Sequence, residues 1–175
     1  RLPCSSVSGG FNPAARSAST WAQRPHKIGA KIMYKNVLLA VDLGEDASWK
    51  RALPEAVALI EASGGVLHIM TVVPDFGMTV VGSFFPSGFE SKAIASAQEK
   101  LHAFVKEHVP QDIKVQHIIA HGSPAEEILA AAKKVPTDVI VVGSHRPGLE
   151  HAILGSVASR VVSHAECSVL VVRGS

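Results

Sequence analysis

The stretch DVIVVGSHRPGLEHAILGSVASRVVSHA, residues 138–165, decides the fold that this chain is expected to adopt. Residues 138–143 form a short apolar run that predicts a buried strand, and residues 156–165 have the apolar spacing of a helix. Gly143 stands where the strand stops, and Gly155-Ser156 stands where the helix begins. Free backbone N–H groups and the positive end of a helix dipole meet at such a helix start, which suits phosphate. The stretch therefore predicts a strand–loop–helix unit that binds a nucleotide.

The same alternation of strand and helix runs through the chain from residue 36 onward. Helical patterns separate the apolar runs, at residues 49–60, 94–105 and 128–135. Strands alternating with helices of this length form an open parallel α/β sheet with right-handed crossovers and helices on both faces. Ligands bind such sheets beyond the carboxyl ends of the strands, where the strand order reverses. The five expected strands are residues 36–42, 66–73, 113–120, 138–143 and 169–172.

Three local signals refine this interpretation. Pro54 lacks a backbone donor, so we expect a kink or a late helix start there. Ser123-Pro124-Ala125-Glu126 has the composition of a helix start, with an N-cap serine, proline at the first helical position and a glutamate that closes a capping box. The strand at residues 113–120 alternates in its first half, which predicts a position near the sheet edge.

Composition and charge exclude several classes of protein. Hydrophobic residues make up 47% of the 175 residues, and no apolar stretch approaches the roughly 20 residues that span a bilayer. Residues 1–32 hold five of the 17 basic residues and none of the 15 acidic ones, so residues 33–175 carry a net charge of −3. A mildly acidic domain without a basic stripe is a poor candidate for binding nucleic acid. The two cysteines, Cys4 and Cys167, indicate no structural disulfide and a reducing cytosol.

Two segments are expected to lie outside the regular pattern. Residues 1–32 are rich in Ser, Ala, Gly, Pro and Arg, which predicts a disordered leader. This leader is either sequence added upstream of a natural start at Met33 or a transit peptide, and the first residue, Arg1, favours the former. Residues 74–88 are an unusually apolar connection. Its 76–85 part is expected either to pack on the domain itself or to form a lid or a partner surface.

The whole domain, residues 33–175, resembles the universal stress protein family. The ATP-binding branch of that family carries glycine, two residues, glycine, nine residues, then glycine and serine or threonine. Here Arg146 occupies the middle position and eight residues separate it from Gly155, a variant that is similar to the F/G-type bacterial subgroup. The resemblance implies a Rossmann-like, adenine nucleotide alpha hydrolase-like topology of order 3-2-1-4-5. It rests on residues 41–42, 71–74, 143–145, 154–156 and 167–173.

The resemblance also implies the residues of an ATP site. Gly155 and Ser156, with the backbone of Val157 and Ala158, would bind phosphate, and a simple helix cap is the alternative. Ala158 stands where ATP-binding members often have threonine. Gly143 would let a ribose approach, or it only ends the strand. Asp42 would lie on the adenine and ribose side, or it caps the next helix. The remaining members of the implied site are Ala40, Val41 and Val72 at the base pocket, with His145 and Arg146 in the loop.

Arg146 could pair with phosphate oxygens or be a solvated loop cation. We expect no catalytic residue and no metal ligand, because the histidines lack metal-ligand spacing and no P-loop lysine, nucleophile elbow or paired carboxylates occur. The leading hypothesis is a cytoplasmic ATP-binding, or ADP- or AMP-binding, stress protein with Mg²⁺ only as counter-ion. It would form a homodimer through residues 168–172. The alternatives are a nucleotide-independent interaction protein and a slow ATPase.

Overall fold

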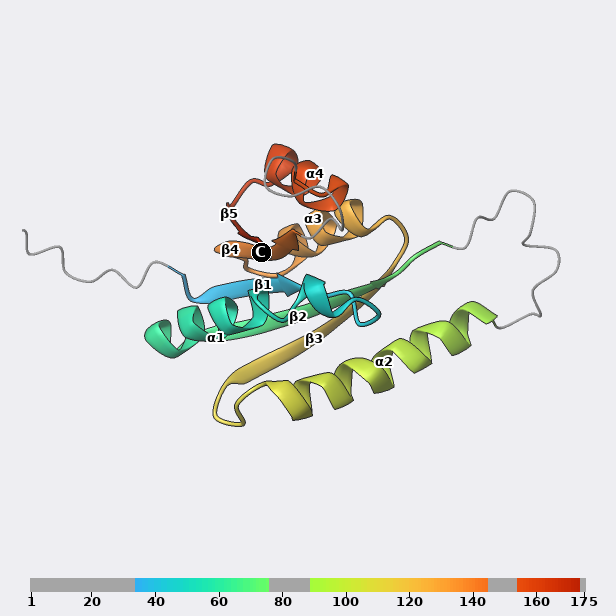
Figure 1. Cartoon of the computed structure of the whole chain (residues 1–175), viewed down its shortest axis with the longest axis horizontal. Helices are drawn as coiled ribbons and strands as arrows, with labels where there is room; N and C mark the ends of the chain where they lie inside the picture. Colours follow the sequence, from blue (N-terminus) through green and yellow to red (C-terminus); the bar gives the residue numbers. More distant parts are fainter. Residues whose placement is uncertain (1–33, 76–88, 145–153, 174–175) are drawn as a thin grey trace, which may run out of the picture. The chain divides into compact units, whose positions relative to one another are not determined.

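The computed structural model describes residues 34–75, 89–144 and 154–173, apart from the side chains of residues 89 and 90. Its five strands form one parallel sheet of order β3-β2-β1-β4-β5, which confirms the predicted fold (Figure 1). The strands are β1 (Asn36–Ala40), β2 (Val66–Val73), β3 (Lys114–His121), β4 (Val139–Ser144) and β5 (Ser168–Arg173). The helices are the 3₁₀ helix η2 (Asp46–Ser48), α1 (Ala52–Ser63), α2 (Phe89–His108), α3 (Pro124–Lys134) and α4 (Ser156–His164).

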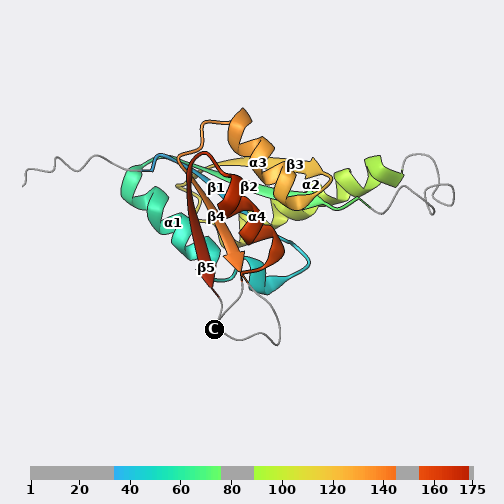
Figure 2. The same ribbon diagram turned by 90° about the horizontal axis from the view of Figure 1, so that it is seen from above.

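Two hydrophobic clusters hold helices to opposite faces of the sheet. Helices α1 and α2 cover one face, and α3 and α4 cover the other (Figures 1 and 2). Successive residues of a strand point to opposite faces, so Val37 and Leu39 join the cluster under α1 and α2 while Leu38 joins the other. The central strands are therefore apolar on both sides, as the continuous apolar runs predict.

The helix starts differ in part from the expectations. Helix α1 begins at Ala52 and places Pro54 in its first turn, where a missing N–H breaks no intrahelical bond, so the late start is confirmed. Ser123 is the N-cap of α3 and Pro124 opens the helix, also as expected. The capping box is wrong. The Ser123 side chain makes no capping hydrogen bond, and the Glu126 carboxylate instead pairs with Arg160 on α4 at 2.8 Å.

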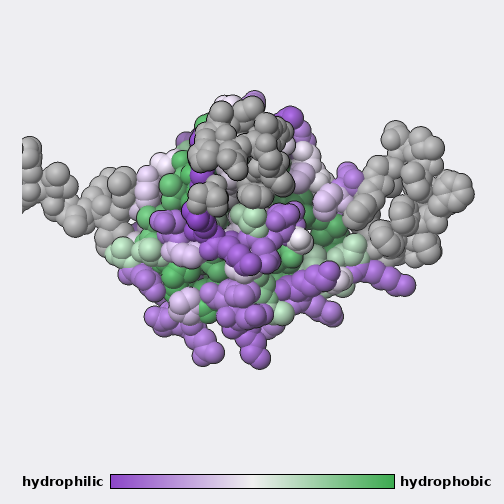
Figure 3. All heavy atoms as spheres, in the orientation of Figure 1, coloured by the Kyte–Doolittle hydropathy of each residue, from purple (hydrophilic) through white to green (hydrophobic). Residues whose placement is uncertain are grey.

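Strands β3 and β5 form the two edges of the sheet. The edge position predicted for residues 113–120 is confirmed, and β3 begins one residue later, at Lys114. Strand β5 is exposed at its two ends and partly exposed between them. Hydrophilic side chains cover the side of the molecule on which α2 lies (Figure 3).

Several expectations concern residues outside those that the structure describes. These are the disordered leader at 1–32, Cys4, the 76–85 surface and the loop residues His145 and Arg146. Cys167 is a free thiol. Among the described helices, none combines the length and the hydropathy that crossing a membrane requires.

Candidate functional site

A cavity of about 400 Å³ opens at the carboxyl end of the sheet, where β1 and β4 lie side by side. The strand order reverses here, because β1 leads to α1 on one face and β4 leads to α4 on the other. Such a switch point is where doubly wound sheets bind their ligands. The lining residues are Ala40, Val41, Asp42, Glu45, Ser48, Met70, Val72, Pro74, Pro124, Ile128, Val142, Gly143, Ser144, Gly155, Ser156, Val157 and Ala158.

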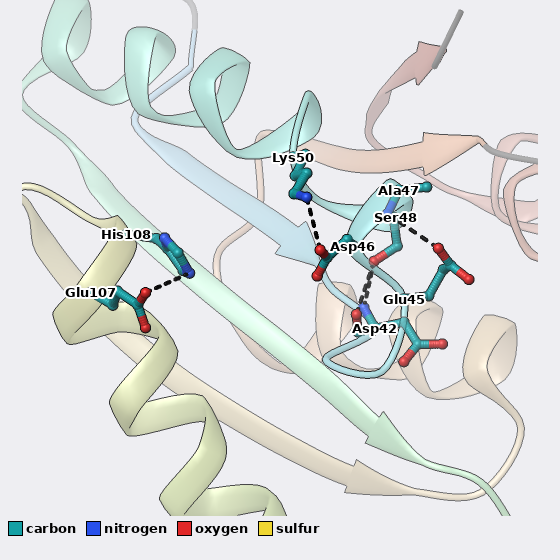
Figure 4. Close-up of polar contacts among 8 residues, drawn as sticks. All are labelled: Asp42, Glu45, Asp46, Ala47, Ser48, Lys50, Glu107 and His108. Atoms are coloured by element: carbon teal, nitrogen blue, oxygen red, sulfur yellow. Dashed lines mark hydrogen bonds and ion pairs between the residues drawn. The ribbon is translucent and has the colours of Figure 1, made fainter.

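One wall of the cavity is acidic and is shaped by a tight turn after β1. The Asp42 carboxylate accepts a hydrogen bond from the Gly44 N–H at 2.9 Å, and the Ser48 hydroxyl bridges the backbone N–H and C=O of Asp42 (Figure 4). Glu45 caps η2 by accepting from the Ala47 N–H at 3.3 Å. The alternative that Asp42 caps the next helix is therefore wrong. The exposed carboxylates of Asp42 and Glu45 at this mouth of the cavity would attract the hydroxyl groups of a ligand and repel its anionic groups.

The floor of the cavity is apolar and carries backbone polar groups at one side. Val41 donates its N–H to the Met70 carbonyl at 2.8 Å, and there the pairing of β1 with β2 ends. Val73 accepts from the Gly122 N–H at 3.0 Å, so its peptide groups face β3. Peptide groups alternate along a strand, so those of Val72 face the side on which β1 has ended. Val72 thus offers a backbone donor and acceptor beside an apolar floor.

The opposite wall is the start of helix α4. Gly155 is its N-cap and has no side chain to cap the helix, and the first intrahelical bond runs from the Ser159 N–H to the Gly155 carbonyl at 2.9 Å. The N–H groups of residues 156–158 precede that bond, so they are the donors that a helix start leaves without intrahelical partners. The Ser144 hydroxyl accepts from the Gly155 N–H at 3.2 Å and holds this helix start against the end of β4.

The structure places different constraints on the two glycines of the site. A Cβ at Gly143 would overlap the carbonyl oxygen of Ser48 and lie 2.8 Å from its carbonyl carbon, so packing of β4 against η2 requires glycine there. A Cβ at Gly155 would meet no atom of the described residues within 4 Å, and its φ of −56° suits any residue. Neither backbone strain nor packing within the described part of the chain explains Gly155.

Nine of the eleven residues assigned to the site from sequence line this one cavity, and the other two, His145 and Arg146, lie outside the described residues. Eight further lining residues were not assigned to the site, although two of them, Pro74 and Ser144, lie in the stretches 71–74 and 143–145 that carry the family resemblance. The sequence did contain a signal for Glu45 and Ser48, since the Asp-x-Gly turn after β1 places both at the same mouth of the cavity as Asp42. It contained a second signal for Pro124, because a helix that follows β3 begins at the carboxyl edge of the sheet. Within the described ranges, no three His, Cys, Asp or Glu side chains cluster in a way that could hold a metal ion.

The fold and the cavity define a Rossmann-like α/β domain with a cavity at its topological switch point. The model of the universal stress protein family matches residues 33–173, and the chain belongs to this family. It is 31% identical over 143 residues to Universal stress protein G of Escherichia coli O157:H7, and the aligned region covers 81% of this chain and 100% of that protein. This similarity fits the F/G subgroup of the family.

Solved structures give the same fold. The structure of MJ0577, solved for a structure-based assignment of its biochemical function, matches with a TM-score of 0.68 and 30% identity and covers 82% of this chain and 98% of that one. A universal stress protein in complex with cAMP matches with a TM-score of 0.52 and 24% identity, covering 82% of this chain and 99% of that one. The second likeness concerns the fold alone.

Proposed function

We propose that this universal stress protein binds an adenine nucleotide, with ATP as the preferred ligand, ADP or AMP as related ones and Mg²⁺ only as counter-ion. The observation that carries the proposal is the start of α4, where the N–H groups of residues 156–158 face a cavity beside a glycine that the described structure does not need. Backbone donors at a helix N-terminus bind phosphate oxygens, and a missing side chain permits close approach.

The rest of the cavity suits a nucleoside. The base would lie on the apolar floor formed by Met70, Val72 and Ile128, with the Val72 peptide groups available to its polar edge. The ribose hydroxyls would lie beside Asp42, because a carboxylate accepts hydrogen bonds and repels phosphate. This order places the negative phosphates at α4 and away from the acidic wall. One protein of this fold is known in complex with cAMP, which supports an adenine nucleotide as a ligand of the fold.

The proposed role of the nucleotide is regulatory. We expect the bound nucleotide to modulate assembly or partner contacts in the cytoplasm, because the sequence has no P-loop lysine motif of the kind that hydrolysing enzymes use. The half-exposed edge strand β5 supports a homodimer through residues 168–172, because an unpaired apolar edge favours pairing with a second copy.

The decisive test is Gly155→Val in the full chain. Its side chain would occupy the space next to the helix start, and its Cβ would meet no described atom within 4 Å, so the domain should stay folded while ATP affinity falls by tenfold or more. Ser163→Val is the matched control, because it adds the same side chain to the exposed last turn of α4. Isothermal titration calorimetry with ATP measures both. Unchanged affinity in Gly155→Val would show that Gly155-Ser156 is only a helix cap.

Two outcomes would favour the other functions. Wild-type protein that carries no nucleotide when denatured and gains no thermal stability in ATP would indicate an interaction protein. Sustained phosphate release that Asp42→Asn abolishes, with ATP binding retained, would indicate a slow ATPase.

A further inference from the structure

The Ser48 side chain at the end of η2 points back to the end of β1 and clamps the backbone of Asp42 (Figure 4). Its Oγ accepts a hydrogen bond from the Asp42 N–H at 3.0 Å and donates one to the Asp42 carbonyl at 3.1 Å. The Asp42 side chain is held at a third point, because its Oδ1 accepts from the Gly44 N–H at 2.9 Å. The backbone and the carboxylate of Asp42 are therefore both fixed at the mouth of the cavity.

Ser48 is itself anchored on two sides. Its backbone carbonyl lies so close to Gly143 of β4 that a Cβ on this glycine would overlap it. The next residue, Trp49, packs edge to face on Phe104 of α2, with ring centroids 4.9 Å apart, and contacts the hydrophobic cluster on that face of the sheet. The clamp on Asp42 thus rests on the core of the domain, which makes it a rigid support.

The Asp42 carboxylate keeps acceptor capacity for a ligand. A carboxylate offers two oxygens with about four acceptor positions, and within the described residues only the Gly44 N–H uses one of them. Hydroxyl groups of a ribose are suitable donors, and hydrogen bonds to a charged acceptor are strong and depend steeply on angle. The loss of one such bond costs about tenfold or more in affinity, so the orientation of this carboxylate matters for binding.

We propose that Ser48 is a positioning residue that orients the Asp42 carboxylate toward the ribose, so that the site selects ribonucleotides over deoxyribonucleotides. This inference rests on the proposed binding of an adenine nucleotide. Glu45 lines the same mouth of the cavity, but its carboxylate caps η2. A carboxylate that is held in place before the ligand arrives loses no conformational freedom on binding, and without the Ser48 hydroxyl this advantage disappears.

The test compares ATP, 2′-deoxy-ATP and 3′-deoxy-ATP by isothermal titration calorimetry on the full chain. The wild type should bind ATP about tenfold or more tightly than at least one of the two deoxynucleotides. Ser48→Ala should weaken ATP binding by about fivefold or more and leave the affinity for that deoxynucleotide within about twofold, because orientation of the carboxylate matters only where the hydroxyl is present. Ser48→Thr keeps the hydroxyl and should retain the preference for ATP.

The matched control is Ser63→Ala at the end of α1. The Ser63 hydroxyl also bridges two backbone groups, since it donates to the Ile60 carbonyl and accepts from the Gly65 N–H, both at 3.3 Å, and it does not line the cavity. Its removal should leave all three affinities unchanged. Circular dichroism checks the fold of each variant. If Ser48→Ala does not fold, Ser48→Cys replaces it with the same expected affinities, because a thiol has nearly the same shape and hydrogen-bonds only weakly.

Two results would overturn this inference alone. One is a wild type that binds ATP and both deoxynucleotides equally well, and the other is a folded variant without the Ser48 hydroxyl that keeps the wild-type ratio of affinities. A wild type that binds none of the three nucleotides would overturn the proposed function as well.

Discussion

The two glycines at the ends of the site provide a matched pair of substitutions with unequal expected effects on stability. In Gly143→Ala the new methyl group overlaps the Ser48 backbone carbonyl, and no side-chain rotation relieves the overlap because the position of a Cβ is set by its own backbone. Strand β4 and helix η2 must therefore separate by roughly 1 Å, which costs about 3 kcal/mol at the upper end of overpacking penalties. A change of that size lowers the melting temperature of a domain of this length by roughly 6 to 12 °C.

Gly155→Ala should have little effect on stability. Its methyl group meets no described atom within 4 Å and its backbone suits alanine, which favours the folded state by about 0.4 to 1 kcal/mol, but an N-cap position prefers glycine to alanine by a similar amount, so the unfolding free energy should stay within about 1 kcal/mol of wild type. Urea titration followed by circular dichroism measures both variants, with the slope m reporting on two-state behaviour. Equal stability of Gly143→Ala and wild type would refute the packing argument. Destabilisation by Gly155→Ala of more than about 1 kcal/mol would refute the claim that the fold does not need this glycine.

Two further predictions concern ionisable groups and pH. The pKa of the buried His68 imidazole is lowered by desolvation, opposed by Gln116 on the next strand, although no hydrogen bond of normal geometry satisfies either ring nitrogen. His68→Leu should therefore be at least as stable as wild type at pH 7. Its advantage in unfolding free energy should grow as the pH falls below about 6.5, where the unfolded wild type takes up the proton first. A difference in unfolding free energy that stays constant in urea titrations from pH 7 to 5 would contradict this. Asp138 accepts from the N–H groups of Lys35 and Asn36 at 2.8 Å, and the Asn36 bond is the main cause of its lowered pKa. Asp138→Asn should lower the free energy of unfolding by about 1 to 2 kcal/mol at neutral pH, and this loss should shrink below about pH 4, where the wild type itself becomes less stable. A loss that stays constant between pH 7 and 3 would show that the geometry of the asparagine, and not the missing charge, causes it.

The sequence predicts the parts of this protein that depend on near neighbours. Alternating or continuous apolar runs mark β1 to β5. Pro54 predicts either a kink or a late start of α1, and the structure shows the late start. The strand boundaries shift by one or two residues, because hydrogen bonding at a strand end depends on the neighbouring strand. The Val41 N–H, for example, still pairs with Met70 after β1 has ended.

The capping box shows where local reasoning stops. Ser123 and Glu126 have the right spacing, but α4 places Arg160 within 2.8 Å of the glutamate. An ion pair between helices competes with the local bond, and no pattern within residues 123–126 contains that information. The same holds for Ser144, whose hydroxyl reaches the Gly155 N–H across the loop.

The sequence by itself determined the order of the elements, the parallel sheet and the glycine and serine at the start of α4, because each depends on periodicity and turn chemistry over a few residues. Tertiary structure alone decided that Glu45 and Ser48 share a cavity with α4 and that Gly143 is glycine because of Ser48. These contacts join segments far apart in the chain. They follow from strand order and register, which place atoms to within an ångström and which local patterns do not encode.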